Sequence, residues 1–203
     1  MRGLFISMEG PDKAGKSTQT KLLYEYLQAK GVDALLTREP GSTPVGEKIR
    51  NVILSTDNDM GDVCEAMLYA AARAEHVRTV LQPQLDAGKT IVCDRYVDSS
   101  IAYQGYGRQL GHEYVQQLND AAIDGLYPDL TIFLYMDPDA AIERIEQKAM
   151  DRLEITDDAF RHRVMEGYLI LEQQYQNRYV RIEAAQPIEA VHNDIVSVVE
   201  QWL

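Results

Sequence analysis

The chain is poor in cysteine and contains no long apolar run. Its two cysteines, Cys64 and Cys93, have neither the spacing of a metal site nor that of a redox motif. We therefore expect two reduced, buried thiols, as is usual in cytosolic proteins. No apolar run approaches the roughly 18 residues that a membrane-spanning helix needs, and no signal-peptide pattern precedes the first apolar segment. The sequence thus predicts a cytoplasmic protein that has no membrane partner.

Basic residues are also scarce. The chain has 20 Lys and Arg residues against 32 Asp and Glu residues, which gives a formal net charge of −12. Non-specific binding to nucleic acid requires a basic field, so we expect no nucleic-acid partner. A phosphate-binding protein with this charge must gather its cations at one place. Arginines outnumber lysines by 13 to 7, and arginine suits bidentate contacts with phosphate.

The 203 residues alternate between short apolar runs and segments that carry a helical apolar stripe. This alternation favours an α/β fold, in which helices cover both faces of a parallel sheet, as a single domain over residues 1–203. The expected strands are 4–8, 32–37, 90–93, 130–136 and 180–183, and the expected helices are 18–29, 44–54, 63–87, 113–123, 157–179 and 187–203. Residues 98–111 are polar and rich in glycine, and we expect one helical turn and an exposed loop there.

The residues after the first expected strand match the phosphate-binding pattern G-x-x-x-x-G-K-[ST]. They are Gly10, Pro11, Asp12, Lys13, Ala14, Gly15, Lys16 and Ser17, and Thr18 begins the expected helix. Glycines allow a tight turn whose backbone N–H groups point at phosphate oxygens, and the following helix adds the positive end of its dipole. In this pattern Lys16 reaches the β- and γ-phosphates, and the Ser17 hydroxyl can bind Mg²⁺. The strand–loop–helix context disfavours the alternative of a glycine-rich turn with a surface lysine.

Further charged residues stand at the ends of other expected strands. Ligands of parallel α/β sheets bind beyond the carboxyl ends of the strands, so these residues belong to one edge. Asp94 follows an apolar strand, which is the position of a second Mg²⁺ carboxylate in phosphate-loop enzymes, and Arg95 is next to it. Arg38 follows the second expected strand. We expect a metal ion on one side of this pair and a phosphate oxygen on the other; the alternative is a strand-end ion pair.

Two helical spacings are open to more than one interpretation. Tyr69 and Arg73 are four residues apart and share a helix face, where a ring and a guanidinium could stack on a base and donate to its carbonyl edge. From the pattern alone, a core tyrosine with a surface arginine is favoured. Arg144, Lys148 and Arg152 recur every four residues. They form either a cationic face near the phosphates or a solvated face paired with glutamates.

Taken together, these residues resemble the thymidylate kinase family, and the resemblance extends over essentially the whole chain. The segments that carry it are 9–17 (EGPDKAGKS), 37–41 (TREPG), 69–73 (YAAAR), 94–96 (DRY), 99–105 (SSIAYQG), 151–154 (DRLE) and 185–187 (AQP). The resemblance implies the three-layer fold of P-loop kinases, with a five-stranded parallel sheet, helices on both faces and a short lid at about 139–156. It also implies a homodimer.

The resemblance implies a reaction as well: transfer of a phosphoryl group from ATP to dTMP, which gives ADP and dTDP for dTTP biosynthesis, with Mg²⁺ as cofactor. The implied contacts of the acceptor are Asp12 with the 3′-hydroxyl, Arg38 and Arg95 with the 5′-phosphate, Arg50 more weakly, and Pro40, Tyr69, Arg73, Ser100, Tyr103 and Gln104 with the base and sugar. Tyr69 would stack on thymine and Arg73 would donate to its O4. Pro40 would lie near the 5-methyl group and Tyr103 would crowd a ribose 2′-hydroxyl. Gln186 would lie near adenine.

The phosphate loop departs from one branch of the family. Many bacterial members have several lid arginines and a glycine where Lys13 stands, whereas here the loop itself is basic and the lid has fewer arginines. We hypothesise that Lys13 supplies catalytic charge together with Lys16 and Arg95. Arg144 is a second candidate for that charge.

Two other functions remain open. The first is another nucleoside monophosphate or deoxynucleoside kinase, which the Tyr69 and Arg73 pair and the carboxylate of Asp12 disfavour. The second is a non-catalytic nucleotide-binding switch. The Asp94–Arg95 pair and the lid arginines favour transfer over signalling, and the sequence has no guanine-reading N-K-x-D stretch.

Overall fold

A five-stranded parallel sheet forms the centre of the computed structural model, which describes residues 2–137, 139–140 and 156–203. The strands are β1 (Phe5–Glu9), β2 (Ala34–Arg38), β3 (Thr90–Asp94), β4 (Leu130–Tyr135) and β5 (Tyr179–Glu183). Their spatial order is β2-β3-β1-β4-β5, and every neighbouring pair is parallel. The α/β fold with five parallel strands that the sequence predicts is therefore confirmed.

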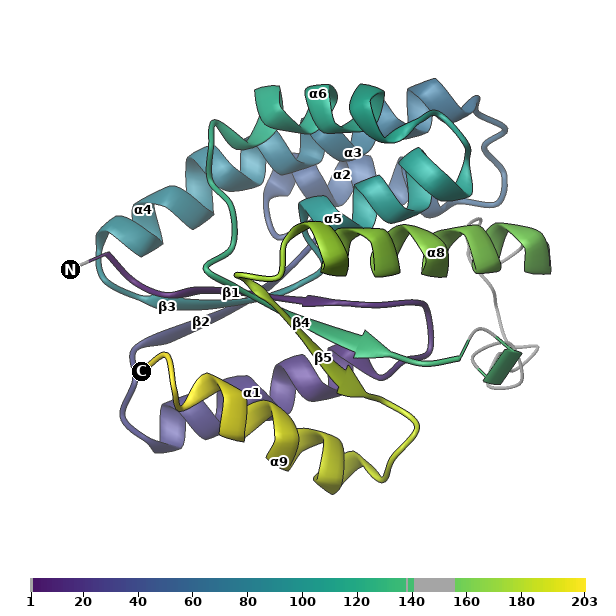
Figure 1. Ribbon diagram of the computed structural model, residues 1–203. Coiled ribbons are helices and arrows are strands. Elements are labelled where there is room, and N and C mark those ends of the chain that lie inside the picture. Colours follow the sequence, from purple (N-terminus) through teal and green to yellow (C-terminus); the bar gives the residue numbers. More distant parts are fainter. Residues whose placement is uncertain (1, 138, 141–155) are drawn as a thin grey trace.

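Helices cover both faces of this sheet (Figure 1). Figure 1 shows α1 (Lys16–Ala29) and α9 (Ile188–Val199) on one face. The other face carries α2 (Pro44–Leu54), α3 (Asp62–His76), α4 (Gln82–Asp86), α5 (Val97–Ser100), α6 (His112–Ile123) and α8 (Asp158–Gln174), together with the π-helical segments η1 (Val77–Leu81) and η2 (Ile101–Gly107). The result is the three-layer arrangement expected from the sequence.

The sheet separates two hydrophobic cores. Side chains alternate along a strand, so Phe5 points into the core under α8 and Ile6 points into the core under α1 and α9. In β4 the same alternation places Phe133 in the first core and Ile132 in the second. Both faces of this strand are buried, which explains its continuous apolar sequence.

The strand register brings the expected phosphate-binding residues to one edge. Asp94 at the end of β3 pairs with Arg38 on one side and with Met8 on the other. Glu9, the last residue of β1, pairs with Phe133 of β4. The carboxyl ends of β1, β2 and β3 are thus level, and the loops that follow them open toward the same side of the sheet.

Residues 98–111 differ from the expected exposed loop. Residues 98–107 continue α5 into η2, where Ile101, Tyr103, Gln104 and Gly107 are buried, and only residues 108–111 lie outside a helix. Gly107 reflects close packing of helices, because a Cβ there would lie 2.7 Å from the ring of Phe160 in α8, whereas Gly111 has the positive φ of a turn glycine. The expectation of a loop was wrong up to residue 107, because a glycine that admits a neighbouring helix and a glycine that makes a turn look alike in the sequence.

Several smaller expectations were also wrong. Cys64 is exposed, since the buried face of α3 is formed by other positions such as Ala66 and Ala70, and only Cys93 is a buried thiol. The helix expected over 157–179 ends at Gln174, because the chain then turns to bury Arg178 against Asp98.

The helix expected over 63–87 is present as α3, η1 and α4 in succession. The helix expected over 187–203 ends at Val199. The expected lid, with Arg144, Lys148 and Arg152, lies outside the described residues except at its two ends. Within the part of the chain that the structure describes, no helix has the length and apolar character needed to cross a membrane.

Candidate functional site

A cavity of about 540 Å³ opens at the carboxyl ends of the strands. Its walls come from the loop after β1, the segment after β2, α3, and the segment from β3 into η2. The lining residues are Asp12, Lys13, Gly15, Lys16, Ser17, Thr18, Arg38, Glu39, Pro40, Arg50, Leu54, Tyr69, Arg73, Asp94, Arg95, Ser99, Ser100, Tyr103 and Gln104. Most of the site residues expected from the sequence therefore lie around one cavity.

The loop between β1 and α1 has the geometry of a phosphate-binding loop. Gly15 is the N-cap of α1 and has a φ of 90°, a left-handed conformation that favours glycine. Gly10 has a φ of 139°, and a Cβ there would lie 2.5 Å from the carbonyl oxygen of Leu134 in β4. The loop can therefore fold closely over the end of the sheet and direct the start of α1 into the cavity.

Lys16 is the buried cation of this loop. Its Nζ donates a hydrogen bond of 2.6 Å to the carbonyl oxygen of Pro11, inside the loop. Burial, and next the positive charge of Arg95, lowers the pKa of Lys16 to about 8, while Asp12 and Asp94 act in the opposite direction. Because the two cations Lys16 and Arg95 share one small volume, an anion bound between them would relieve their repulsion.

Two oxygen-bearing side chains meet beside the loop. The hydroxyl of Ser17 donates a hydrogen bond of 2.5 Å to Oδ2 of Asp94 at the end of β3. A hydroxyl next to a carboxylate is a donor set for hard cations such as Mg²⁺. Among the described residues no group of three or more His, Cys, Asp or Glu side chains is arranged to hold a metal ion. A cation at this position would therefore need further oxygen ligands from a bound phosphate or from water.

Arg95 lies at the centre of the site. Its backbone has a φ of 69°, which is uncommon for a residue other than glycine. One guanidinium nitrogen, Nη1, donates to the carbonyl of Gly10 (3.1 Å), to Ser99 Oγ (3.1 Å) and to the hydroxyl of Tyr168 (3.3 Å). The other nitrogen, Nη2, donates to Asp12 and, at 3.1 Å, to the hydroxyl of Tyr103. These contacts hold a fixed positive charge at the cavity wall.

Asp12 is ionised next to this guanidinium. Partial removal from water would raise the pKa of Asp12, but the charges of Arg95 and Lys16 and the hydrogen bond from Tyr103 together lower it below its usual value. One oxygen accepts from Arg95 and the other accepts from Tyr103 at 2.8 Å. A carboxylate oxygen can accept more than one hydrogen bond, so Asp12 can still take a hydroxyl donor from the cavity.

Glu9 lies beneath Arg95 and is fully buried. Its oxygens accept hydrogen bonds from the Tyr96 backbone N–H (2.7 Å), from Ser99 (2.5 Å) and from Tyr168 (3.1 Å). Ser99 and Tyr168 are two of the groups that contact Arg95, so Glu9 supports the arginine through them. Burial, and next the charge of Asp98, raises the pKa of Glu9 to about 7.

This raised pKa predicts a pH effect on stability. Between about pH 4.5 and about pH 7 the folded protein keeps a proton on Glu9 that the unfolded chain has lost, so rising pH removes up to about 3 kcal/mol of unfolding free energy. In Glu9→Gln this loss should be missing. Urea unfolding of both proteins at about pH 5 and about pH 7.5 measures it. Glu113→Gln, an exposed change on α6, serves as control, and equal pH slopes in wild type and Glu9→Gln would contradict the prediction.

The segment after β2 carries arginines at the mouth of the cavity. Arg38 is about half exposed and pairs with Glu47 of α2 at 2.9 Å. Arg50 of the same helix donates to the carbonyl of Pro40 at 3.0 Å. An anion that enters here must compete with Glu47 for Arg38, as it must compete with Asp12 for Arg95; the two arginines differ in exposure, since the side chain of Arg38 is 46% exposed and that of Arg95 is 18% exposed.

The far wall of the cavity is formed by Tyr69, Arg73, Ser100 and Gln104. Tyr69 is half-buried, whereas Arg73 is only 1% exposed, so the interpretation of Arg73 as a surface arginine was wrong. Its Nη1 donates to Ser100 at 2.9 Å. Gln104 donates from its amide nitrogen to Oε1 of the buried Glu65 at 2.8 Å. This hydrogen bond fixes the orientation of the amide of Gln104, so that the amide oxygen can accept a hydrogen bond from an N–H group of a ligand.

Some expected site residues lie elsewhere. Gly10, Pro11 and Ala14 belong to the loop but do not line the cavity, and Arg144 lies outside the described residues. Gln186 is exposed, follows β5, and donates to the carbonyl of Glu183 (3.0 Å) and to Asp194 (3.1 Å). The cavity wall also includes three residues to which the sequence assigned no role, Glu39, Leu54 and Ser99. Glu39 and Ser99 are adjacent in the sequence to residues expected to bind the ligand. This adjacency is the feature by which the sequence could have identified them.

Comparison with known proteins gives relatives over the full length. The family model "Thymidylate kinase" matches residues 8–195. A thymidylate kinase of Exiguobacterium sp. is 47% identical over 198 residues, which cover 97% of this chain and 93% of the relative. A thymidylate kinase of Caldanaerobacter subterraneus subsp. tengcongensis is 45% identical over 203 residues, which cover 100% of this chain and 98% of the relative.

A solved structure gives the same result. The crystal structure of thymidylate kinase from Ehrlichia chaffeensis superposes with a TM-score of 0.82 at 33% sequence identity, and the match covers 98% of this chain and 100% of that one. The sequence comparisons, the sheet order and the superposition agree over nearly the whole length. The chain therefore belongs to the thymidylate kinase family.

Proposed function

We propose that the chain transfers the γ-phosphoryl group of ATP to the 5′-phosphate of dTMP, forming ADP and dTDP as a step of dTTP biosynthesis. One observation carries the proposal: a single cavity is lined both by a phosphate-binding loop and by a ring, a buried guanidinium and an oriented amide. Arg95 and Asp12, which are paired, line the same cavity. Membership of the thymidylate kinase family supports the same reaction.

On the donor side, the loop from Gly10 to Thr18 binds the phosphates of ATP through its backbone N–H groups and the amino group of Lys16. Lys13 is exposed at the cavity and can add charge to the same phosphates. The hydroxyl of Ser17 and the carboxylate of Asp94 fit Mg²⁺, since both offer oxygen and lie 2.5 Å apart. Bound there with ATP, Mg²⁺ neutralises phosphate charge. We place Gln186 near the adenine, outside the cavity described above.

On the acceptor side, the ring of Tyr69 stacks on thymine and Arg73 donates to O4. The amide oxygen of Gln104 accepts from N3–H, because its nitrogen is held by Glu65. Asp12 accepts from the 3′-hydroxyl. The further contacts are Ser100 at the base edge, Pro40 near the 5-methyl group, Tyr103 against the 2′ position, and Arg38, Arg50 and Arg95 around the 5′-phosphate.

The chemistry requires little covalent participation by the protein. The acceptor oxygen must be placed in line with the γ-phosphate, and the negative charge of the transferred group must be neutralised. Arg95 is held by five hydrogen bonds on the acceptor side, and Lys16 is buried on the donor side. Fixed donors of this kind stabilise the transition state without first having to reorganise.

The test is ADP release from ATP and Mg²⁺ with dTMP, dUMP, AMP, CMP and GMP supplied separately. We expect dTMP to be preferred by a large factor, about 10³-fold over the ribonucleotides, because unpaired polar groups in the base pocket penalise the wrong base. Preference for another monophosphate would retain the phosphate chemistry and reject the assignment of Tyr69 and Arg73. ATP binding without acceptor-dependent ADP release would favour a nucleotide-binding switch.

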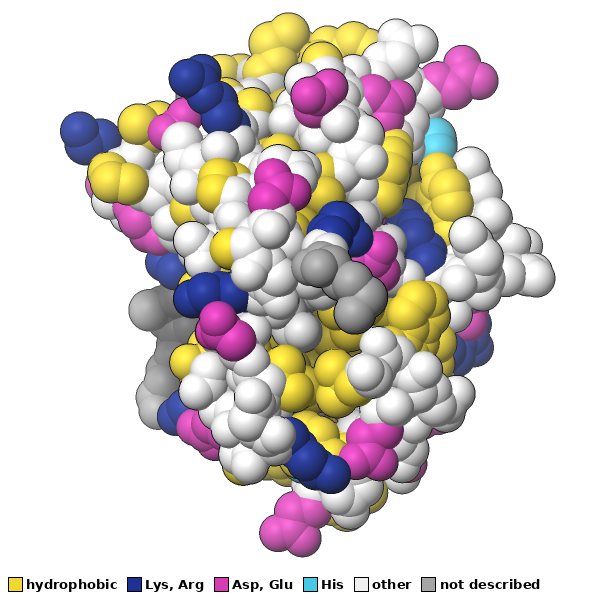
Figure 2. All heavy atoms as spheres, turned by 90° about the vertical axis from the view of Figure 1, so that its left-hand side faces the viewer, with side chains coloured by type: hydrophobic (Ala, Val, Ile, Leu, Met, Phe, Trp, Pro, Cys, Tyr) yellow, Lys and Arg dark blue, Asp and Glu magenta, His cyan; other side chains and the backbone are white. Residues whose placement is uncertain are grey.

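We also propose that residues 1–203 act as one domain and as a homodimer in the cytoplasm. The dimer is supported by large apolar side chains exposed on α3 and α6, where Met67 is 50%, Val63 43% and Tyr114 38% exposed. Sedimentation of the chain as a monomer would exclude the dimer. No nucleic-acid partner is proposed: on the face at the amino ends of the strands, the described basic side chains are scattered among acidic ones (Figure 2).

A further inference from the structure

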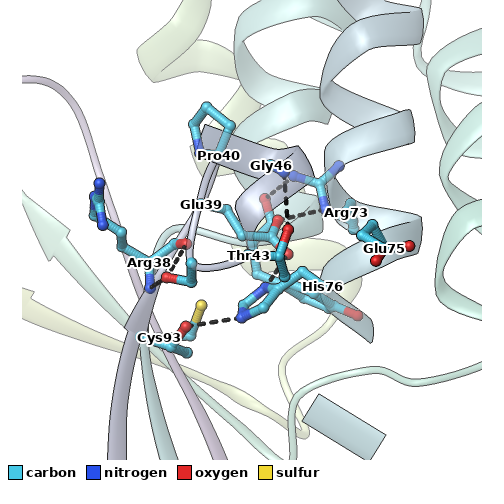
Figure 3. Close-up of polar contacts among 12 residues, drawn as sticks. Arg38, Glu39, Pro40, Thr43, Gly46, Arg73, Glu75, His76 and Cys93 are labelled. Carbon is cyan, nitrogen blue, oxygen red and sulfur yellow. Dashed lines mark hydrogen bonds and ion pairs between the residues drawn. The ribbon is translucent and has the colours of Figure 1, made fainter. Parts of the chain in front are cut away.

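A buried polar cluster lies directly behind the wall of the cavity. Figure 3 shows Arg73 and His76 extending from α3 toward Glu39, which follows β2. The side chains of Glu39, Arg73 and His76 are 3%, 1% and 0% exposed. Such groups are costly to bury unless each has a partner. Their contacts therefore indicate what holds Arg73 in place.

The contacts form a continuous chain of hydrogen bonds from Thr37 in β2 through His76 and Glu39 to Arg73, which we call the relay. Oε2 of Glu39 accepts from Nε of Arg73 at 2.7 Å, and Oε1 lies 2.9 Å from Nδ1 of His76. Nε2 of His76 lies 2.7 Å from the hydroxyl of Thr37. A carboxylate accepts hydrogen bonds, so Nδ1 donates to Oε1 of Glu39, and Nε2 shares a hydrogen bond with the hydroxyl of Thr37. Both ring nitrogens of His76 therefore have partners.

The relay leaves Arg73 little freedom. Nη1 donates to Ser100 and to Asn119, and Nη2 donates to the carbonyl of Tyr96 at 3.0 Å. With the Nε–H bound by Glu39, four of the five N–H groups have partners. The described residues provide none for the second N–H of Nη2. Arg73 lines the cavity, so this N–H is the one that a ligand can use.

The position of Glu39 links two parts of the site. It stands between Arg38 and Pro40, and all three residues line the cavity. Its carboxylate therefore ties the phosphate-contacting segment to the helix that carries Arg73. An arginine whose Nε–H lost this partner could rotate about its side-chain torsions and point its remaining donor elsewhere.

We propose that Glu39 and His76 are positioning residues that aim the free N–H of Arg73, and that they thereby set the preference of the acceptor pocket for a base with a carbonyl at this edge. The inference rests on the proposed function, in which Arg73 donates to O4 of thymine. Neither residue contacts the base; both act through Arg73. His76 acts through Glu39, whose carboxylate it holds in place.

Three substitutions distinguish an effect on the hydrogen bonds of the relay from a loss of folding. Glu39→Gln keeps the shape and one acceptor oxygen for Arg73 but removes the charge. His76→Leu removes both ring contacts, whereas His76→Asn keeps a donor close to the position of Nδ1. Glu75→Gln is the matched control, because Glu75 adjoins His76 on α3 and its half-buried side chain makes no polar contact with another described residue.

The experiment measures kcat and KM for dTMP and for dCMP, which carries an amino group in place of O4, and KM for ATP. Partners behind a functional side chain typically contribute about 10–100-fold in metal sites. We expect Glu39→Gln and His76→Leu to raise KM for dTMP about 10-fold and to lower the dTMP to dCMP preference about 10-fold, with KM for ATP nearly unchanged. His76→Asn should restore most of the preference, and Glu75→Gln should behave as wild type.

Two outcomes overturn the inference. In the first, Arg73→Lys abolishes the preference while Glu39→Gln and His76→Leu keep it; the pocket is then correct and the relay is not needed. In the second, both variants lose kcat and raise KM for ATP and dTMP together, which indicates a purely structural role. A wild type without preference for dTMP would instead reject the proposed function. If His76→Leu fails to fold, Glu39→Gln decides, since it conserves side-chain shape.

Discussion

Replacing Lys16 with methionine should lower kcat by about 10³-fold, the upper range for removal of one fixed donor from a phosphoryl-transfer site. Lys16 is 6% exposed and lies in the loop at the start of α1. In the proposed reaction its charge reaches the β- and γ-phosphates, where negative charge rearranges during transfer. Methionine keeps the length and apolar stem of the side chain, so the change removes the charge and little else. Single-turnover measurement of ADP formation at saturating ATP and dTMP isolates this step.

Lys21→Met is the matched control for this experiment. Lys21 lies on the same helix, is 70% exposed and pairs only weakly with Glu25 at 3.7 Å. Its removal should change kcat by less than about two-fold, as expected for a surface position. Near-normal kcat in a folded Lys16→Met protein would contradict a catalytic role for Lys16 and would direct attention to Lys13 as the main cation of the loop.

The phosphate loop could be predicted from the sequence because its geometry is local. Its glycines stand where the backbone has positive φ or approaches another strand, and Lys16 and Ser17 follow at once. The strand ends at Arg38 and Asp94 could be predicted for a similar reason. In a parallel sheet, every strand that ends in a polar residue contributes to the same edge. Periodicity and a few fixed turns were enough for both.

The environment of Arg73 could not be predicted in this way. Its hydrogen-bond partners Glu39, Tyr96, Ser100 and Asn119 are 23 to 46 residues away along the chain. Helical spacing relates Arg73 to Tyr69 and says nothing of these distant groups. A surface arginine was therefore the favoured interpretation of the pattern, although the side chain is buried. Burial of a charge becomes possible only when the tertiary fold supplies acceptors.

The same reasoning explains the error at residues 98–111. Polar residues in that stretch are satisfied by distant partners, as when Gln104 donates to Glu65. Its Gly107 packs against Phe160 and Val164 of α8, more than fifty residues further along the chain, and Gly167 on that helix in turn admits Tyr106. Composition alone assigns polar, glycine-rich segments to loops. The exception arises because this segment lies between the site and the core and needs both polar groups and close packing.

Replacing Arg95 should have the second large effect. Arg95→Ala should lower kcat/KM for dTMP by about 10³-fold, since it removes the cation that faces the acceptor phosphate in the proposed reaction and also the guanidinium partner of Asp12. Arg95→Lys keeps the charge but loses the planar fork that reaches Asp12 and Tyr103 from one nitrogen and Gly10, Ser99 and Tyr168 from the other. We expect a fall of about 10²-fold for the lysine variant. KM for ATP should change little in both proteins.

The lysine variant decides between charge and geometry. If charge alone matters, Arg95→Lys will be nearly as active as wild type, and the fork, the positive φ and the support from Glu9 lose their functional meaning. If geometry matters, activity falls with the charge still present. Arg181→Lys, which alters a surface pair with Glu172, controls for loss of an arginine as such. Arg38→Ala should cost less than Arg95→Ala, because the side chain of Arg38 is about half exposed and water screens its charge more than that of the 18% exposed Arg95; a larger loss there would make Arg38 the main phosphate ligand.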